Sequence, residues 1–392
     1  MKQKLAYILK YNRIIYIFYY TLMSICINIM KLFVKTDDKL ILFNSYAGRK
    51  FDDSPRAIFE VMKADKRFTN YKMVWAFHEP DKFVVEDAIK IKTDGLKYFK
   101  TALTARVWIT NSSVERGLNF VGKNTLYFNT WHGTPIKKMG SEIKHEKKSH
   151  ILKKISPVDV FMSQSEYESE IFSRTYNIPK ERFLKAGLPR NDILANYSAE
   201  LRRQIRAKLL LPEDKKVILY CPTFREFEKD KLWGIVLAPP IDLNKWEKEL
   251  GTDFVLLFRA HYEVSRAMEI RDNMFVRNMT DYPNLNELII ATDILISDYS
   301  SIFFDYSITG KPMFHFTYDY EKYASQRGMY FDIRDYLSGA ESEDELIEIL
   351  KSFDEKDEIR KTISFRKQFV NYYGHATNQA VDCIAKRINR VS

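Results

Sequence analysis

The sequence predicts an α/β protein built from two doubly wound domains that face one another across a cleft. Short apolar runs typical of strands alternate with helical stretches from residue 40 to residue 162. The same alternation begins again after residue 200. At 392 residues the chain is also longer than one ordinary hydrophobic core accommodates. A parallel sheet covered by helices explains this rhythm in both halves.

The first half is expected to hold five strands, at residues 40–44, 72–77, 107–110, 126–129 and 158–162. A helix is expected over 54–64, with Ser54 as its N-cap and Pro55 at its first position. The second half is expected to hold four strands, at 217–221, 254–258, 293–296 and 313–316. The polar segment 186–198 is a reasonable hinge, so the expected domains cover residues 37–188 and 189–392, the latter with C-terminal helices.

The N-terminal segment 1–36 contains seventeen uncharged residues, 14–30, between Arg13 and Lys31. This length is at the short limit for a bilayer span, and no signal-peptide cleavage site follows. Tyrosine and phenylalanine crowd its first half, and basic flanks favour anionic lipid. We therefore expect a membrane-associated helix lying in the interface; a buried core helix and a single span are the alternatives.

Composition narrows the function classes. The formal net charge of +10 favours anionic partners such as phosphates, nucleic acid or acidic lipids, without choosing among them. Three widely spaced cysteines exclude a disulfide framework and a cysteine-rich zinc site. We expect no metal and no cofactor, since no ligand cluster with metal spacing and no glycine-rich nucleotide loop is present. No recognised nucleic-acid motif appears either, although the charge alone permits a basic nucleic-acid-binding protein.

Open α/β sheets bind ligands at the carboxyl ends of their strands, and in the first half one such end carries a histidine. His132 lies in the sequence TWHGTP directly after the strand 126–129. Thr134 and Pro135 are expected to open a helix here. A histidine in such a turn is able to accept a hydroxyl proton near neutral pH, and a structural role in the turn is the alternative.

Three strand ends in the second half carry groups suited to phosphate. Thr223 and Arg225 follow the strand 217–221, and Arg259 and His261 follow the strand 254–258. The third end carries the serines Ser300 and Ser301, where a helix N-terminus offers N–H groups to an anion. Solvated surface charges and ordinary helix capping are the respective alternatives.

A run of lysines follows the TWHGTP turn. It is expected to form either a solvated face or a cationic rim that attracts anionic lipid or a phosphate-rich acceptor. The lysines singled out for that rim are Lys137, Lys138, Lys147 and Lys148.

Together these stretches resemble the CDP-glycerol glycerophosphotransferase family, the teichoic-acid primases and polymerases. The resemblance is carried, in the family's order, by FNSYAGRKFDDSPRAIFEVM, TWHGTPIKKMG, AGLPRND, YCPTFRE, RAHY, DILISDYSSIFFDYSITGKPMFHFTYDYEKY and RGMYFD.

The resemblance implies a GT-B architecture of two Rossmann-like domains. It also implies transfer of glycerol phosphate from CDP-glycerol to a polyprenyl-diphosphate-linked acceptor, with release of CMP, at the inner face of a bacterial membrane. His132 falls on the family's histidine taken as general base. His261 and Arg259 fall on the motif near the donor diphosphate, Ser300 and Ser301 on its phosphate-binding serines, and Thr223 and Arg225 on a segment beside the donor. A CDP-ribitol donor, or a nucleotide sugar used by a glycosyltransferase of the same fold, is the alternative.

Overall fold

The computed structural model describes residues 12–143, 157–223, 225, 239–260, 264, 268 and 270–389. The chain forms two compact units. The first unit comprises Met1–His132, Glu146–Asp192 and His375–Ser392, and the second comprises Gly133–His145 and Ile193–Gly374. The domain limits expected from the sequence remain predictions.

The first unit contains a seven-stranded sheet in which every strand pair is parallel. Its strand order is β3-β2-β1-β4-β5-β6-β7, the doubly wound order extended by one strand. From β1 the chain adds β2 and β3 on one side and β4 to β7 on the other, so the strand order reverses between β1 and β4. A ligand site is expected at such a switch point. The strands are β1 (Asp37–Asn44), β2 (Lys72–Phe77), β3 (Ile89–Lys92), β4 (Ala105–Thr110), β5 (Leu126–Asn129), β6 (Val160–Ser163) and β7 (Phe183–Lys185).

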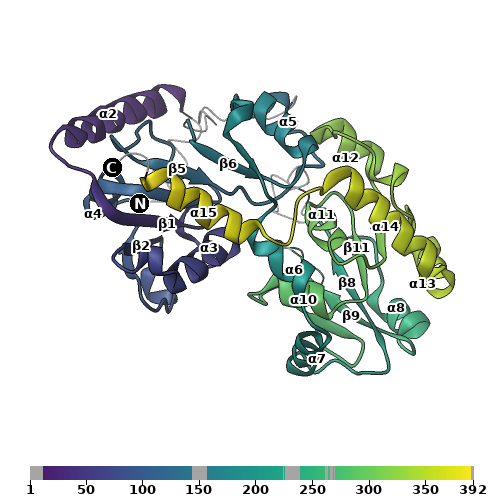
Figure 1. Ribbon diagram of the computed structural model, residues 1–392. Helices are drawn as coiled ribbons and strands as arrows, with labels where there is room; N and C mark the ends of the chain where they lie inside the picture. The colour runs from purple at the N-terminus through teal and green to yellow at the C-terminus, as the bar shows by residue number, and fades with distance from the viewer. Residues whose placement is uncertain are drawn as a thin grey trace. The chain divides into compact units, whose positions relative to one another are not determined.

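Helices pack on this sheet, among them α3 (Asp53–Ala64), α4 (Leu96–Thr104) and α5 (Glu166–Tyr176). The last helix, α15 (Ala376–Asn389), returns to the first unit and lies beside α3 (Figure 1). Its apolar side chains belong to the same core as those of β1, β2 and α3. The C-terminal end of the chain therefore completes the hydrophobic core of the unit formed mainly by the N-terminal half.

The second unit repeats the same topology with six parallel strands in the order β10-β9-β8-β11-β12-β13. Its strand order reverses between β8 and β11, which form the switch point of this sheet. The strands are β8 (Lys216–Cys221), β9 (Phe254–Phe258), β10 (Val276–Asn278), β11 (Ile294–Ser297), β12 (Met313–Phe316) and β13 (Gly339–Ala340). The helices of this unit include α7 (Ala199–Lys208), α8 (Leu243–Leu250), α11 (Ile302–Ser307), α12 (Tyr320–Arg327), α13 (Glu343–Ser352) and α14 (Glu355–Phe369).

The predicted α/β class with two Rossmann-like units is confirmed. All nine expected strands are present within two residues of their expected limits, apart from the start of β1, which lies three residues earlier. Four further strands, β3, β7, β10 and β13, lie toward the sheet edges, and their short runs lack a continuous apolar pattern. One local prediction was wrong: Asp52, not Ser54, caps α3, because Asp52 accepts the N–H of Asp53. The helix begins at Asp53, two residues before Pro55, which was expected at its first position.

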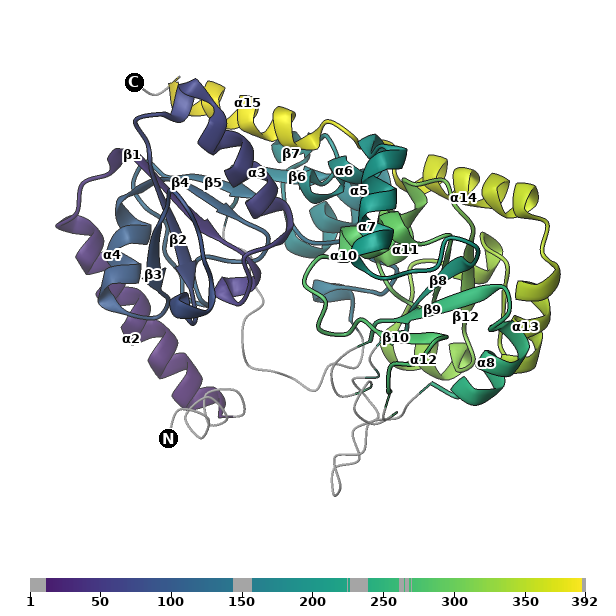
Figure 2. The ribbon, with the colours of Figure 1, turned by 90° about the horizontal axis from the view of Figure 1, so that it is seen from below.

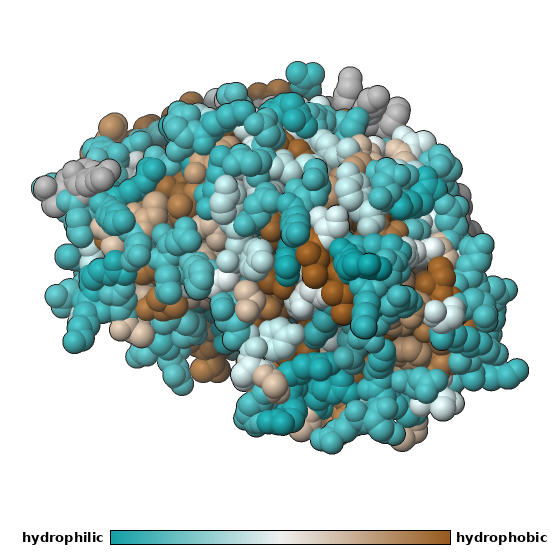
Figure 3. All heavy atoms as spheres, turned by 45° about the vertical axis from the view of Figure 1, so that its right-hand side comes forward, coloured by the Kyte–Doolittle hydropathy of each residue, from teal (hydrophilic) through white to brown (hydrophobic). Residues whose placement is uncertain are grey.

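The N-terminal helix α2 (Arg13–Leu32) lies alongside α4 in the first unit (Figures 1 and 2). It is the one helix in the described part of the chain that is long and apolar enough to cross a membrane. Only Tyr16, Ser24 and Ile27 of this helix are buried. Most of its other apolar side chains, among them Ile14, Phe18 and Leu32, are exposed. On the face of the molecule drawn in Figure 3, hydrophilic residues predominate, with apolar residues visible between them.

Candidate active site

The candidate site of the first unit forms where the sheet reverses, between the loops that follow β1 and β4. The side chain of Asn111, after β4, accepts the N–H of Tyr46, after β1, at 2.8 Å. The neighbouring Ser112 hydroxyl accepts the N–H of Ala47 at 2.9 Å. Tyr46 and Ala47 both adopt a left-handed backbone, which non-glycine residues rarely do. These two hydrogen bonds therefore hold a strained turn, η1 (Tyr46–Gly48), at the switch point.

His132 lies beside this turn, after β5. Asn129 accepts the N–H of Trp131 at 2.8 Å, Trp131 is left-handed, and its ring stacks on the His132 ring with centroids 4.5 Å apart. The Nδ1 atom of His132 lies 2.6 Å from the carbonyl oxygen of Asn111. Since a carbonyl only accepts, Nδ1 carries the proton, and in the neutral ring the lone pair is on Nε2.

Burial is the main influence on His132 and lowers its pKa below the usual value. The hydrogen bond to Asn111 and the charge of Asp53 oppose this effect, while Arg190 adds to it. The imidazole is therefore neutral at neutral pH. A neutral ring with an oriented lone pair can accept a proton, which is the chemistry expected of a general base.

The helix predicted to open at Thr134 and Pro135 is absent, so that prediction was wrong. The backbone here forms hydrogen bonds within the second unit instead. Tyr330 donates to the carbonyl of Ile136 at 2.8 Å, and Lys138 donates to the carbonyl of Gly328 at 3.0 Å. Pairing with a segment about 190 residues away satisfies these groups, and the sequence near His132 gives no sign of it.

The candidate site of the second unit also forms at its switch point. The side chain of Asp298, after β11, accepts the N–H of Thr223, after β8, at 2.9 Å. Ser297 donates its hydroxyl to the carbonyl of Cys221 at 2.6 Å. The Oγ1 atom of Thr223 is buried and has no hydrogen-bond partner among the residues that the structure describes. A buried hydroxyl without a partner at a strand end is suited to a ligand or a water molecule.

Arg225 is buried in the same site, with a side chain that is 3% exposed. Its guanidinium donates to Asp298 at 2.7 Å and to both carboxylate oxygens of Asp319 at 2.7 and 2.9 Å. Tyr299 lies against it and also donates its hydroxyl to Asp319 at 2.9 Å. Burial would lower the pKa of Arg225, but the two carboxylates more than offset burial and raise it. The guanidinium is thus held between the carboxylates of Asp298 and Asp319. The sequence had suggested instead that it is a donor to phosphate oxygens.

Ser300 and Ser301 lie at the start of α11, close in sequence to Asp298. The Ser300 hydroxyl accepts the N–H of Ile302 at 3.3 Å, a long hydrogen bond. Ser301 occupies the N-cap position, but its side chain makes no capping hydrogen bond. Both residues are partly exposed. The two hydroxyls are therefore placed where phosphate oxygens could accept from them.

The remaining predicted residues are placed as follows. Arg259 donates through Nη1 to the carbonyls of Met279 and Tyr282, at 2.7 and 2.6 Å. Lys137 lies in an antiparallel bridge with Met329. His261, Lys147 and Lys148 lie outside the described residues. No group of three or more histidine, cysteine or acidic residues able to hold a metal is found in the described part of the chain.

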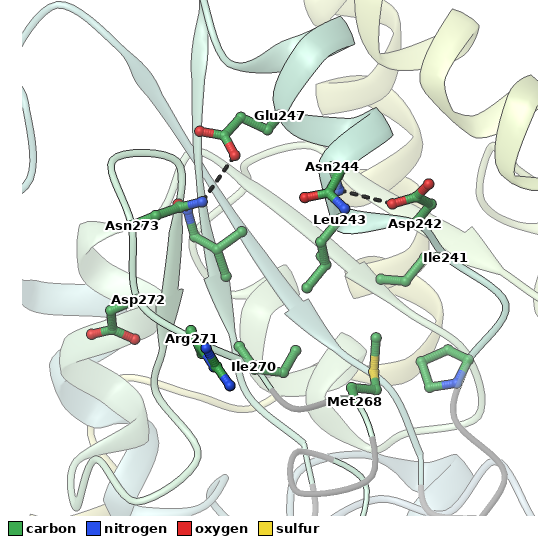
Figure 4. A pocket seen from close by; sticks show the side chains of 12 residues that line it. Ile241, Asp242, Leu243, Asn244, Glu247, Met268, Ile270, Arg271, Asp272 and Asn273 are labelled. Carbon is green, nitrogen blue, oxygen red and sulfur yellow. Dashed lines mark hydrogen bonds between the residues drawn. The ribbon is translucent and has the colours of Figure 1, made fainter.

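A pocket of about 560 Å³ lies elsewhere in the second unit, at the start of α8 (Figure 4). Asp242, Glu247 and Asp272 line it together with a single cationic residue, Arg271. Asn273 donates to Glu247 across its wall at 2.9 Å. This excess of carboxylates disfavours a diphosphate, so we do not assign the donor to this pocket.

The sequence pattern does not predict a role for several residues that the structure places in these sites. Asp53 and Arg190 contact each other beside His132, and Asp298 and Asp319 bind Arg225. All four occur in the segments that carry the family resemblance. Asp53, however, reads as part of a helix start, and the pairing of Arg225 with Asp319 joins residues 94 positions apart.

A family model for CDP-glycerol:poly(glycerophosphate) glycerophosphotransferase matches residues 26–386. The chain is 37% identical over 315 residues to a teichoic acid poly(glycerol phosphate) polymerase of Staphylococcus epidermidis, covering 77% of this chain and 43% of that protein. It thus spans less than half the length of that relative. It is 32% identical to a polymerase of the same description from Bacillus spizizenii, covering 85% of this chain and 88% of that protein. It is also 30% identical to a teichoic acid glycerol-phosphate transferase of Staphylococcus aureus, with 83% and 87% covered.

Among solved structures, the chain is similar to the wall teichoic acid polymerase TagF. The TM-score is 0.82 at 32% identity, with 95% of this chain and 98% of the TagF chain covered. Another matched TagF structure, of a histidine-to-asparagine variant, was soaked with CDPG. At this identity and coverage the likeness extends to both units and confirms the GT-B-like architecture.

Proposed function

We propose that this chain, which belongs to the CDP-glycerol:poly(glycerophosphate) glycerophosphotransferase family, transfers glycerol phosphate from CDP-glycerol to an acceptor hydroxyl and releases CMP. The acceptor of this proposal is a polyprenyl-diphosphate-linked saccharide in the synthesis of teichoic acid or a related surface polymer. The observation that carries the proposal is the state of His132, whose Nδ1 is bound to a carbonyl so that Nε2 is free to take a proton.

In the proposed reaction, Nε2 of His132 accepts the proton of the acceptor hydroxyl. The oxygen attacks the β-phosphorus of CDP-glycerol in line, a new P–O bond forms, and the bond to the bridging oxygen breaks as CMP leaves. Negative charge on the diphosphate would be met by Ser300, Ser301, Arg259 and His261. Arg225 would act from inside the site by holding Asp298 and the Thr223 turn. Positioned donors of this kind supply much of the acceleration in phosphoryl transfer.

The test is turnover of CDP-glycerol by the purified protein with a lipid-linked acceptor. His132→Ala should lower turnover by at least about 100-fold while CDP-glycerol binding changes little. His375→Ala, which removes an exposed histidine of the same unit, is the matched control. Near-normal turnover in His132→Ala would remove His132 as the base.

The donor is tested separately. CDP-glycerol, CDP-ribitol and a UDP-sugar are supplied in parallel with the acceptor, and nucleotide release and product mass are measured. The proposal expects CMP release and a mass increase of one or more glycerol phosphate units with CDP-glycerol. Transfer only from the UDP-sugar would show a glycosyltransferase of the same fold, and transfer only from CDP-ribitol would show the other alcohol.

The proposed location is the cytoplasmic face of the membrane, with α2 lying in the interface. Two features of α2 support this. Its exposed apolar residues Ile14, Phe18, Ile25 and Ile29 recur at spacings of four and seven, as on one face of a helix. On another side, Asn28 donates to the carbonyl of Asn119 at 3.0 Å, and the Ser24 hydroxyl accepts the N–H of Asn119 at 3.2 Å. These hydrogen-bonded contacts keep the helix against the first unit, a geometry that suits an interfacial helix better than a span.

Sedimentation with vesicles of anionic lipid tests this location. The double variant Phe18→Asp/Ile25→Asp should lose most vesicle binding, because each change places a charge on the lipid-facing stripe. The double variant Lys66→Glu/Lys63→Glu adds at least as much negative charge elsewhere on the first unit and serves as the control. Equal binding by the two variants would exclude the stripe as the membrane surface.

A further inference from the structure

The carboxylate of Asp53 is buried beside the His132 turn, and contacts within the helix start explain only one of its two oxygens. Its Oδ1 accepts the N–H of Ser54 at 2.6 Å, whereas its Oδ2 points away from the helix backbone to other side chains. Asp53 is the first residue of α3, but Asp52 provides the cap and accepts the N–H of Asp53 at 2.7 Å. Asp53 is 8% exposed and adopts a left-handed backbone with φ of 65°. A buried charge on an unfavourable backbone requires compensating contacts, and such strain clusters at functional sites.

These contacts join Asp53 to the elements around His132. Its Oδ2 accepts the Tyr46 hydroxyl at 2.6 Å and Arg190 Nη1 at 2.8 Å. The same Nη1 donates to the main-chain carbonyl of His132 at 2.9 Å. The Tyr46 ring lies 5.6 Å from the imidazole, centroid to centroid. One carboxylate oxygen therefore connects α3, the η1 turn and η6 (Pro189–Asn191) to the histidine.

Within the described part of the chain, the ionisable side chains that face His132 are Asp53 from α3, Arg190 from η6 and Tyr46 from η1. Burial raises the pKa of the Tyr46 phenol, with Asp53 adding to the effect, so this group stays neutral. Burial would raise the pKa of Asp53, but Arg190 and the Tyr46 hydrogen bond outweigh it and keep the carboxylate ionised. Asp53 thus supplies the negative charge near the imidazole, and it opposes both burial and Arg190.

We infer that Asp53 is a positioning residue for His132: its carboxylate fixes the Tyr46–Arg190 frame and stabilises the imidazolium formed when Nε2 takes a proton. The inference rests on the proposed role of His132 as base. It differs from the usual carboxylate–histidine arrangement, because Nδ1 is oriented by the Asn111 carbonyl and the carboxylate acts through space. A main-chain carbonyl therefore fixes the tautomer of the ring, and no carboxylate is hydrogen-bonded to Nδ1.

The test compares Asp53→Asn with Asp52→Asn. Asparagine at 53 keeps the size and one of the two accepting oxygens but removes the charge. Asp52→Asn removes a neighbouring charge while keeping a capping side chain. The pKa of His132 is measured by NMR in protein carrying ¹³C-labelled histidine. Its signal is assigned by its loss in His132→Gln. The acid limb of the pH profile of turnover is measured beside it.

Asp53→Asn should lower the pKa of His132 by about one unit, a tenfold change in its protonation equilibrium. Turnover should fall about tenfold with little change in KM for CDP-glycerol. Asp52→Asn should change none of these. Arg190→Gln, which removes the opposing charge, should shift the His132 pKa upward, and this provides a second variant should Asp53→Asn fold poorly. Opposite shifts from the two variants are not expected of residues that only support the fold.

An unchanged His132 pKa in folded Asp53→Asn would overturn the inference, as would a downward shift in Arg190→Gln. The proposed function fails in a different way. If the His132 pKa shifts as expected but His132→Ala keeps near-normal turnover, the coupling of Asp53 to His132 stands and the base assignment does not.

Discussion

Arg225 makes the sharpest prediction about the second unit, because the structure places its guanidinium between two carboxylates. The side chains of Arg225 and Asp298 are 3% and 2% exposed, and that of Asp319 is 14% exposed. Arg225→Met would leave both carboxylates buried without their cation. Breaking a buried pair in this way costs about 3–5 kcal/mol.

That loss should lower the unfolding temperature of the second unit by roughly 6–20 °C, since 1 kcal/mol corresponds to about 2–4 °C for a unit of this size. Calorimetry of the purified variant measures the effect, and titration with CDP-glycerol measures donor binding. Arg203→Met is the control: Arg203 pairs with Glu200 on α7, their side chains are 72% and 58% exposed, and its loss should cost at most about 1 kcal/mol.

The sequence alone suggested that Arg225 contacts the donor, and the same experiment separates the two roles. If Arg225→Met unfolds at the same temperature as Arg203→Met but binds CDP-glycerol much more weakly, the guanidinium serves the donor and our interpretation of the carboxylate pair is refuted. A lower unfolding temperature with donor affinity retained in the folded fraction supports a structural role.

Two further predictions concern stability. Gly48→Ala should cost about 1–2 kcal/mol for the left-handed backbone and more for its contacts, because the new Cβ would lie 3.0 Å from the Ala76 carbonyl oxygen. It should also lower turnover by disturbing Tyr46, whereas Gly95→Ala, where a Cβ meets nothing within 4 Å, should do neither. Burial, with a smaller effect of Arg334, lowers the pKa of His315 from 6.5 to about 4. Between these two pH values the unfolded chain binds more protons than the folded chain, so the free energy of unfolding falls as the pH falls. Denaturant titration should show that the free energy of unfolding of the second unit falls by about 2 kcal/mol from pH 7 to pH 5. An equal fall in His315→Gln would show that His315 does not cause it.

The strands could be predicted because each buried strand is a short continuous apolar run. His132 could be selected because it directly follows such a run. The environment of His132 could not be predicted, since it depends on Asn111, Asp53 and Arg190, which meet it only after the sheet has formed. The same holds for the segment after His132, whose hydrogen bonds go to residues 328–330 and not to a helix.

The N-terminal helix illustrates a different limit. Composition indicated an apolar helix over residues 14–30, and the structure contains α2 over Arg13–Leu32. Hydropathy does not distinguish the buried side of such a helix from its exposed side. The contacts of Ser24 and Asn28 with Asn119 make that distinction, because they identify which face packs on the first unit.

The two units use one backbone arrangement for two kinds of chemistry. In the first unit, the side chain of Asn111, after β4, accepts the N–H of Tyr46 in the loop after β1. In the second unit, the side chain of Asp298, after β11, accepts the N–H of Thr223 in the loop after β8. The amide of asparagine is neutral, so in the first unit the tie adds no charge beside His132. The carboxylate of aspartate is charged, and in the second unit it binds the buried cation of Arg225 while holding the Thr223 loop. The same hydrogen bond is therefore compatible with a neutral base in one unit and a buried ion pair in the other, and the choice of amide or acid at this position matches the charge that each site must accommodate.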